Sequence, residues 1–270
     1  MRFHSLVITG AVVVLDAFPL AAQLRSTRPV APQASLPWLL VANPHSSSAR
    51  DSGPAVRIGH GMRERIARVA ERWYRTVERA RMNDALINSS FPVDAVLGPE
   101  MARQLARELQ ARTLVLSTIL RGDDDRMTLE ARLTGVGDEA GQVVKLIQRP
   151  NESFEELGDR AGRALEAAFK ALPDARQCES LRATAPEKAA EAAVRAIRTQ
   201  PNSGLANYCL ARIVKGRKTG RDTVIALLRR STQADPLSLA AWTALSSCTS
   251  AAAKRPRPPG SVAAKSSPRL

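Results

Sequence analysis

The sequence has few of the residues from which enzyme and metal sites are usually built. It contains three histidines and three cysteines in 270 residues. His4, His45 and His60 are far apart along the chain, so no spacing typical of a zinc site is present. No nucleophile–base pair and no carboxylate dyad falls within a catalytic motif. The sequence therefore predicts a protein that is not an enzyme and that uses no metal or cofactor.

Two short motifs have a functional interpretation, but in each case a structural one is favoured. Gly59-His60-Gly61 begins like a dinucleotide-binding loop, but Glu64 stands where the third glycine would be. Asp123-Asp124-Asp125 is rich enough in carboxylates to hold calcium, yet its composition is also that of a solvated hairpin tip. We expect a helix start at the first motif and a turn at the second.

Aromatic residues are scarce, at 4% of the chain, so few rings are present on which nucleobases could stack. The net charge of +14 is unevenly distributed. Residues 51–175 contain 19 basic and 20 acidic residues, whereas residues 176–250 contain 12 and five. Because nucleic-acid binding needs basic residues clustered on one face, the sequence argues against it. Binding of an anionic polymer by the basic carboxy-terminal third stays open as an alternative.

Long apolar runs are absent after residue 23, so the sequence predicts no membrane span, which needs about 20 residues. The first 22 residues resemble a signal peptide. Arg2 gives a positive start, residues 6–20 are mostly apolar, and Ala21 and Ala22 are small residues suited to cleavage before Gln23. A buried amino-terminal helix is the alternative, but the Pro- and Arg-containing linker at 23–35 argues against it. We therefore expect an exported protein, periplasmic or secreted.

Residues 98–148 predict a helix that leads into a three-stranded meander. The helix has an apolar stripe, formed by Met101, Ala102, Leu105, Ala106 and Leu109. Strands are then expected at three places: 113–120, where β-branched residues gather, 127–133, where apolar and polar residues alternate, and 142–148. We expect this helix to cover Leu116 and Leu133 on one face of an antiparallel sheet, with Glu130 on a solvated face.

The surrounding residues extend this unit to 36–175. We expect a strand at 36–42, a helix at 59–73, a short strand at 74–78, a helix at 79–88 and a final helix from 151 to Pro173. In the helix at 59–73, the solvent side is expected to consist of Arg63, Arg65, Arg68 and Arg72. The order β-α-β-α-α-β-β-β-α describes an α+β protein with a mixed α/β sandwich domain.

Three stretches of this domain resemble the amino-terminal domain of TolB-like proteins. They are GHGMRERIARVAERWYRTVERARMNDAL (59–86), VLGPEMARQLARELQARTLVLSTILRG (96–122) and DRMTLEARLTGV (125–136). They are also similar to the related fold of curli-secretion and flagellar-associated envelope proteins. The positions that match the family pattern are Gly61, Leu97-Gly98, Leu105, Leu109, Gly122 and Leu133. The first strand has Val41-Ala42-Asn43-Pro44 instead of the family's V-x-x-F. The resemblance covers residues 36–172 and implies a packing domain without catalytic residues.

Residues 176–250 have a different period, that of paired helices. Helices are expected at 186–198, 205–214 and 222–232, and Pro201 and Pro236 lie 35 residues apart. This segment resembles the 34-residue tetratricopeptide repeat, whose helix pairs stack to form a binding groove. Trp242 begins a repeat that lacks its second helix, so we expect self-association. Residues 251–270 have the composition of a disordered basic tail.

The resemblance to tetratricopeptide repeats predicts the positions of two sets of residues, a pair of cysteines and the lining of a groove. Cys178 and Cys209 fall near the first helices of successive repeats, so in an oxidising compartment they would form a disulfide, with two buried thiols as the alternative and Cys248 left over. The groove is expected to be lined by Asn207, Arg212, Lys215 and Trp242. The sequence thus favours a non-enzymatic cell-envelope protein that binds another protein.

Overall fold

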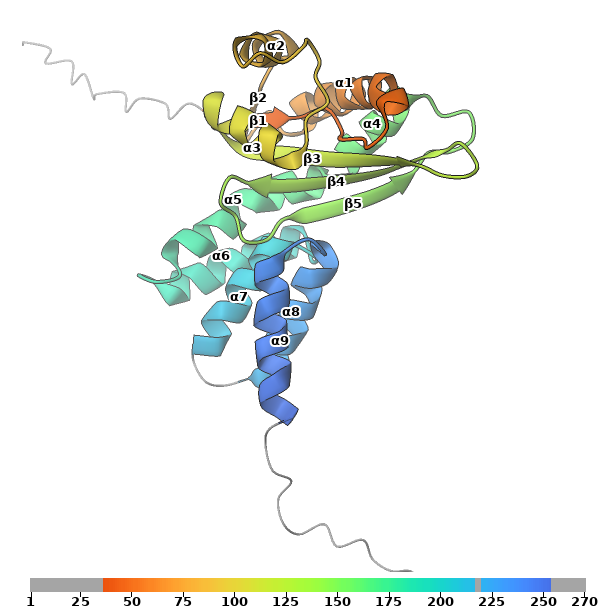
Figure 1. Cartoon of the computed structure of the whole chain (residues 1–270). Coiled ribbons are helices and arrows are strands. Elements are labelled where there is room, and N and C mark those ends of the chain that lie inside the picture. The colour runs from red at the N-terminus through yellow and green to blue at the C-terminus, as the bar shows by residue number, and fades with distance from the viewer. Residues whose placement is uncertain (1–35, 217–219, 254–270) are drawn as a thin grey trace, which may run out of the picture. The chain divides into compact units, whose positions relative to one another are not determined.

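The computed structural model describes residues 36–216 and 220–253, with side chains as far as residue 250. The predicted signal peptide and linker lie outside the described residues, as does the basic tail beyond residue 253. The described residues from Leu36 onward form one compact unit. The expected α+β class is confirmed, because a five-stranded mixed sheet is combined with helices (Figure 1).

The sheet has the strand order β2-β1-β3-β4-β5. Its strands are β1 (Trp38–Val41), β2 (Arg75–Thr76), β3 (Ala111–Arg121), β4 (Met127–Gly135) and β5 (Gln142–Ile147). Strand β1 pairs in parallel with β2 and β3, whereas β3, β4 and β5 form the antiparallel meander. The parallel pairs need long crossovers, and these are supplied by the helices that cover the sheet.

Helices cover both faces of β3. One face packs against α1 (Ser52–Val69), α4 (Phe154–Ala164) and α5 (Glu166–Leu181), and the other against α2 (Arg79–Asn88) and α3 (Pro99–Glu108) (Figure 1). Val115 lies opposite Leu133 in the first core, while Leu116 packs with Leu105 in the second. The expectation that one helix covers both Leu116 and Leu133 was therefore wrong. Strand alternation places them on opposite faces.

The contact between α1 and α4 is close because it is made by glycines. A Cβ atom at Gly61 would overlap the backbone carbonyl of Glu155, and one at Gly158 would overlap that of Ile58. Helix α1 begins at Ser52, earlier than the expected residue 59. Pro54 lies in the first turn, where an amide proton is not needed, so a loop-like composition is compatible with a helix.

The helix expected to end before Pro173 is in fact two helices, and the second continues past the proline. Helix α4 ends at Ala164, Leu165 joins it to α5, and α5 continues through Pro173 to Leu181. The expected domain boundary at 175 thus falls inside α5. The remaining helices are α6 (Pro186–Thr199), α7 (Gly204–Gly216), α8 (Arg221–Ala234) and α9 (Leu239–Ala253).

Arg63 is buried, with 5% of its surface exposed, and the expectation that it faces solvent was wrong. Its Nη1 donates to the carbonyl of Val41 at 2.7 Å, and its Nη2 donates to Oδ1 of Asn43 at 3.1 Å. The side chain therefore satisfies acceptors at the end of β1. Burial lowers the pKa of the Arg63 guanidinium to about 10.

Candidate functional site: a groove in the helical segment

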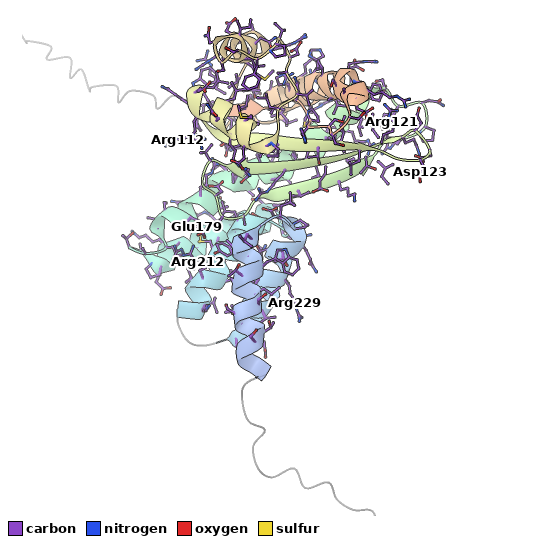
Figure 2. The ribbon with its side chains drawn as sticks, in the orientation of Figure 1. Arg112, Arg121, Asp123, Glu179, Arg212 and Arg229 are labelled. Carbon is purple, nitrogen blue, oxygen red and sulfur yellow. A yellow bond between two sulfur atoms is a disulfide. The ribbon has the colours of Figure 1, made fainter. Side chains whose placement is uncertain are left out.

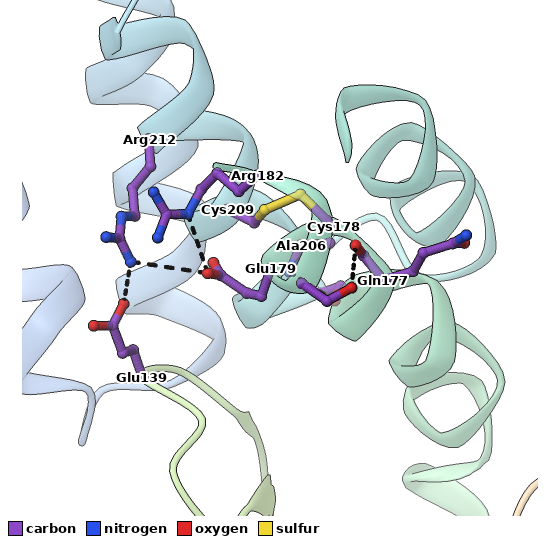
Figure 3. Close-up of a disulfide and its surroundings, with 10 residues drawn as sticks. Glu139, Gln177, Cys178, Glu179, Arg182, Ala206, Cys209 and Arg212 are labelled. Carbon is purple, nitrogen blue, oxygen red and sulfur yellow. Dashed lines mark hydrogen bonds and ion pairs between the residues drawn. A yellow bond between two sulfur atoms is a disulfide. The ribbon is translucent and has the colours of Figure 1, made fainter. Parts of the chain in front are cut away.

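Helices α5 to α9, called the helical segment below, are joined near their centre by a disulfide. Cys178 of α5 and Cys209 of α7 are bonded, with their Cα atoms 6.3 Å apart (Figure 3). Both cysteines are fully buried in an apolar cluster that includes Ala189 and Ala193 of α6. The bond holds α5 and α7 side by side, with α6 packed on both. Cys248 is buried separately and is a free thiol.

Next to the disulfide, charged side chains form a chain of ion pairs (Figure 3). Nε of Arg182 lies 3.3 Å from a Glu179 carboxylate oxygen, which is 3.8 Å from Nη1 of Arg212. The same Nη1 lies 2.5 Å from Oε2 of Glu139. The Arg212 guanidinium also stands 5.5 Å from the ring centroid of Tyr208. Burial, followed by the nearby Glu139 carboxylate, raises the pKa of Tyr208. These pairs fix Arg212 in one orientation.

An open groove of about 370 Å³ lies beside this ion-pair chain. Its apolar lining comes from α7, α8 and α9 and consists of Tyr208, Ala211, Val224, Leu228 and Ala244. Its basic lining consists of Arg182, Arg212 and Lys215. Lys215 is exposed and forms no ion pair with any described residue. The groove, called the helical groove below, therefore combines an apolar floor with two arginines that are paired with Glu139 and Glu179 and with the ammonium of Lys215.

The structure brings together only two of the four residues that the sequence placed in a groove. Arg212 and Lys215 line the helical groove. Asn207 is fully buried, and its Nδ2 donates to the carbonyls of Pro201 and Ser203 at 3.1 and 2.7 Å. Its expected exposure was wrong, because the first turn of α7 packs against the sheet. Trp242 is 46% exposed but does not line the groove, and its indole N–H donates to the carbonyl of Pro236.

Asp235 joins the helical segment to the sheet, a role that no sequence pattern predicts. Its fully buried carboxylate accepts hydrogen bonds from Arg132 of β4 at 2.7 Å and from the backbone N–H of Gly141 at 2.6 Å. Nearby, the Ser238 hydroxyl donates to the carbonyl of Glu139 at 2.6 Å. In the sequence, Asp235 stands between the helix expected at 222–232 and Pro236, and no motif includes it. Its long-range partners are 94 and 103 residues away.

The helical segment packs on the turn between β4 and β5. A Cβ at Gly204 would overlap the carbonyl of Gly141, so the first turn of α7 lies directly on the turn. Ala140 is buried among side chains of α7, α8 and α9. The orientation of the helical groove is thereby fixed relative to the sheet.

The two motifs for which the sequence allowed nucleotide or calcium binding are a part of a helix and a hairpin turn in the structure. Gly59-His60-Gly61 is inside α1 and not in a loop before it, so it cannot wrap a phosphate. At the β3–β4 turn, where Figure 2 labels Asp123, the neighbouring carboxylates Asp124 and Asp125 pair with Arg126 and Arg121. Within residues 36–216 and 220–250, no group of three or more His, Cys, Asp or Glu side chains is placed to hold a metal ion.

None of the helices in the described part of the chain has both the length and the apolar character needed to cross a membrane. A comparison of the chain with protein-family models, with curated proteins and with solved structures finds no match.

Proposed function

We propose that this protein is a non-enzymatic, exported cell-envelope protein that binds an acidic, partly apolar segment of another protein in the helical groove. The observation that carries the proposal is the chemistry of the groove, an apolar floor next to Arg182, Arg212 and Lys215, whose ammonium has no ion-pair partner among the described residues. An extended or helical peptide would bury apolar side chains on the floor and place carboxylates beside the basic residues. The groove is preorganised, because the disulfide and the ion-pair chain fix α5 and α7.

The architecture adds support to this proposal. Successive helices of the segment pack as neighbours, and α5 also contacts α7, as the first helices of stacked tetratricopeptide repeats do. We therefore interpret α5 to α9 as a short repeat array attached to a TolB-like sheet domain. A buried disulfide is typical of oxidising compartments, which favours a periplasmic or secreted location. Export is tested by mass spectrometry of the protein made in a Gram-negative host, where we expect a mature start at Gln23.

Peptide binding is tested by fluorescence anisotropy with two labelled probe peptides of equal length and leucine content, one rich in glutamate and one rich in lysine. We expect the full-length protein to bind the acidic peptide only. Lys215→Glu reverses a charge in the groove and should weaken binding about tenfold or more, in line with a hydrogen-bonded charge pair. Arg229→Glu is the matched control, because Arg229 is an exposed residue on α8 that does not line the groove (Figure 2). Equal binding of both peptides would contradict the proposal.

Binding of an anionic polymer is the second candidate, favoured by the basic excess of residues 176–250. The same experiment separates the two functions. A polymer that binds through many charges should lose affinity steeply as the salt concentration rises. It should also lose affinity when any surface arginine, including Arg229, is replaced by glutamate. A peptide held on the apolar floor retains most of its affinity between 50 and 200 mM salt, and Arg229→Glu leaves it unchanged.

A further inference from the structure

A second cavity lies between α3 and the sheet, on the face opposite α4 and α5. Its volume is about 230 Å³, below the roughly 300–1,000 Å³ of sites for drug-sized ligands, so it has room only for a small molecule. Apolar side chains form one side of it, among them Leu97, Ala102 and Leu116. The other side is charged and consists of Arg103, Glu130 and Arg132. We call this cavity the strand pocket.

Two opposite charges of the strand pocket lie close together on one strand. Glu130 and Arg132 are two residues apart on β4 and therefore point to the same face, with about 7 Å between their Cα atoms. Arg132 is held in place by two hydrogen bonds to Asp235 through Nε and Nη2. Its Nη1 forms no hydrogen bond within the described residues and remains a donor. Arg103 approaches from α3, where its Nη1 is paired with the exposed carboxylate of Glu100.

Several residues that line the strand pocket have a polar group without a partner in the described part of the protein, among them Glu130, His45 and Ser117. The Glu130 carboxylate is half-buried and forms no ion pair or hydrogen bond there, although Lys145 lies opposite it on β5. Nδ1 of His45 is buried without a hydrogen-bond partner. His45 forms an isolated parallel β-bridge with Thr118, and Thr118 lies opposite Glu130 in the sheet. The side chains of all three residues therefore lie on the same face of the sheet. Buried polar atoms are nearly always hydrogen-bonded, so a bound molecule would supply the partner that Nδ1 of His45 lacks.

We propose that the strand pocket binds a free aliphatic α-amino acid. The ligand's carboxylate would accept hydrogen bonds from Arg132 and Arg103, because guanidinium groups match carboxylates in shape and charge. Its ammonium would donate to Glu130 and to Nδ1 of His45. Its aliphatic side chain would pack on Leu97, Ala102 and Leu116. A simple carboxylic acid provides no donor for Glu130, and a simple amine provides no acceptor for Nη1 of Arg132.

The test uses isothermal titration calorimetry on the full-length protein with three probes that share the same branched aliphatic group. L-Leucine carries both charged groups, 4-methylpentanoate lacks the ammonium, and 3-methylbutylamine lacks the carboxylate. We expect only leucine to bind. Binding of none of the three, or binding of 4-methylpentanoate as tightly as leucine, would overturn the proposal.

Variants then assign the contacts. Glu130→Gln should weaken leucine binding about ten- to a hundred-fold and reduce the preference for leucine over 4-methylpentanoate, since one charged hydrogen bond is lost. Arg103→Gln should weaken leucine binding in the same range. Glu64→Gln is the control, because Glu64 is an exposed glutamate of α1. Circular dichroism confirms that each variant is folded. Unchanged leucine affinity in folded Glu130→Gln would contradict the assignment.

Discussion

The carboxylate of Asp235 and the guanidinium of Arg132 form a buried ion pair between the end of α8 and the middle of β4. Nη2 of Arg132 lies 2.7 Å from Oδ2 of Asp235, and the exposed fractions of the two side chains are 13% and 0%. The same carboxylate oxygen accepts the Gly141 N–H, so its desolvation is compensated by several hydrogen bonds. This pair links the helical segment to the sheet and also orients one wall of the strand pocket.

Asp235→Asn should lower the free energy of unfolding by about 3–5 kcal/mol, because Arg132 is left as a buried charge without a counter-ion. Urea unfolding followed by circular dichroism measures the effect. Glu191→Gln, at an exposed residue of α6, is the control and should change stability by less than about 0.5 kcal/mol. The double variant Asp235→Leu/Arg132→Met should recover part of the loss, since neither charge then remains buried alone. Equal stability of the Asp235→Asn and control variants would refute a structural role for the pair.

The disulfide should contribute about 2–4 kcal/mol to stability, because it closes a loop between residues 31 apart in the sequence. Cys178→Ala/Cys209→Ala should lose this amount, and addition of a reducing agent should then have no further effect on the variant. Thiol titration of the denatured, unreduced protein should find one free thiol, that of Cys248. Three free thiols in protein purified from an oxidising compartment would show that the bond does not form.

Gly61→Ala should destabilise the protein by about 1–3 kcal/mol or more, even though alanine favours helices. The added methyl group would overlap the carbonyl of Glu155 in α4 and push the two helices apart. Gly53→Ala, in the same helix, is the matched control, because its Cβ would meet no atom within 4 Å. The control should be neutral or stabilising by up to about 1 kcal/mol. Thermal unfolding of both variants separates steric overlap from helix propensity, and similar melting temperatures would contradict the packing.

Tyr74 should ionise well above the pH at which tyrosine usually does. Burial raises the pKa of its phenol to about 12. In Tyr208→Phe, Tyr74 is the single tyrosine left, so absorbance at 295 nm follows it alone. The folded pKa exceeds the unfolded value of 10, so the folded state holds the proton more tightly. This contribution to stability is complete below pH 10 and is lost as the pH rises to about 12. A midpoint near 10 in the folded protein would contradict the burial of this side chain.

Helix α9 should cause self-association. Leu239 and Trp242 are 80% and 46% exposed on a helix whose other face packs on α8. Exposed apolar residues of this kind promote contact with a second chain. Trp242→Glu should therefore reduce the average mass in light scattering, whereas Thr243→Glu, at the adjacent exposed residue, should not. If the unmodified protein is monomeric at high concentration, the prediction fails.

Much of the local structure could be predicted from the sequence because it depends on local patterns. The alternation of residues 127–133 is that of β4, and the apolar stripe around Leu105 is that of α3. Both patterns arise from burial on one side of an element, which requires no knowledge of distant partners. The α+β class followed from the same patterns.

The tertiary structure alone decided which residues meet. Arg63 has the sequence context of a solvated helix face, but a carbonyl at the end of β1 lies within its reach. In the sequence, Asn207 has the position of a groove residue. In the structure it is buried, because the β4–β5 turn covers the start of α7. Asp235 and Arg132 are 103 residues apart, and nothing in the neighbourhood of either indicates the other. Pairings between distant residues depend on how helices and strands pack, so the sequence determined the elements and the three-dimensional packing determined the sites.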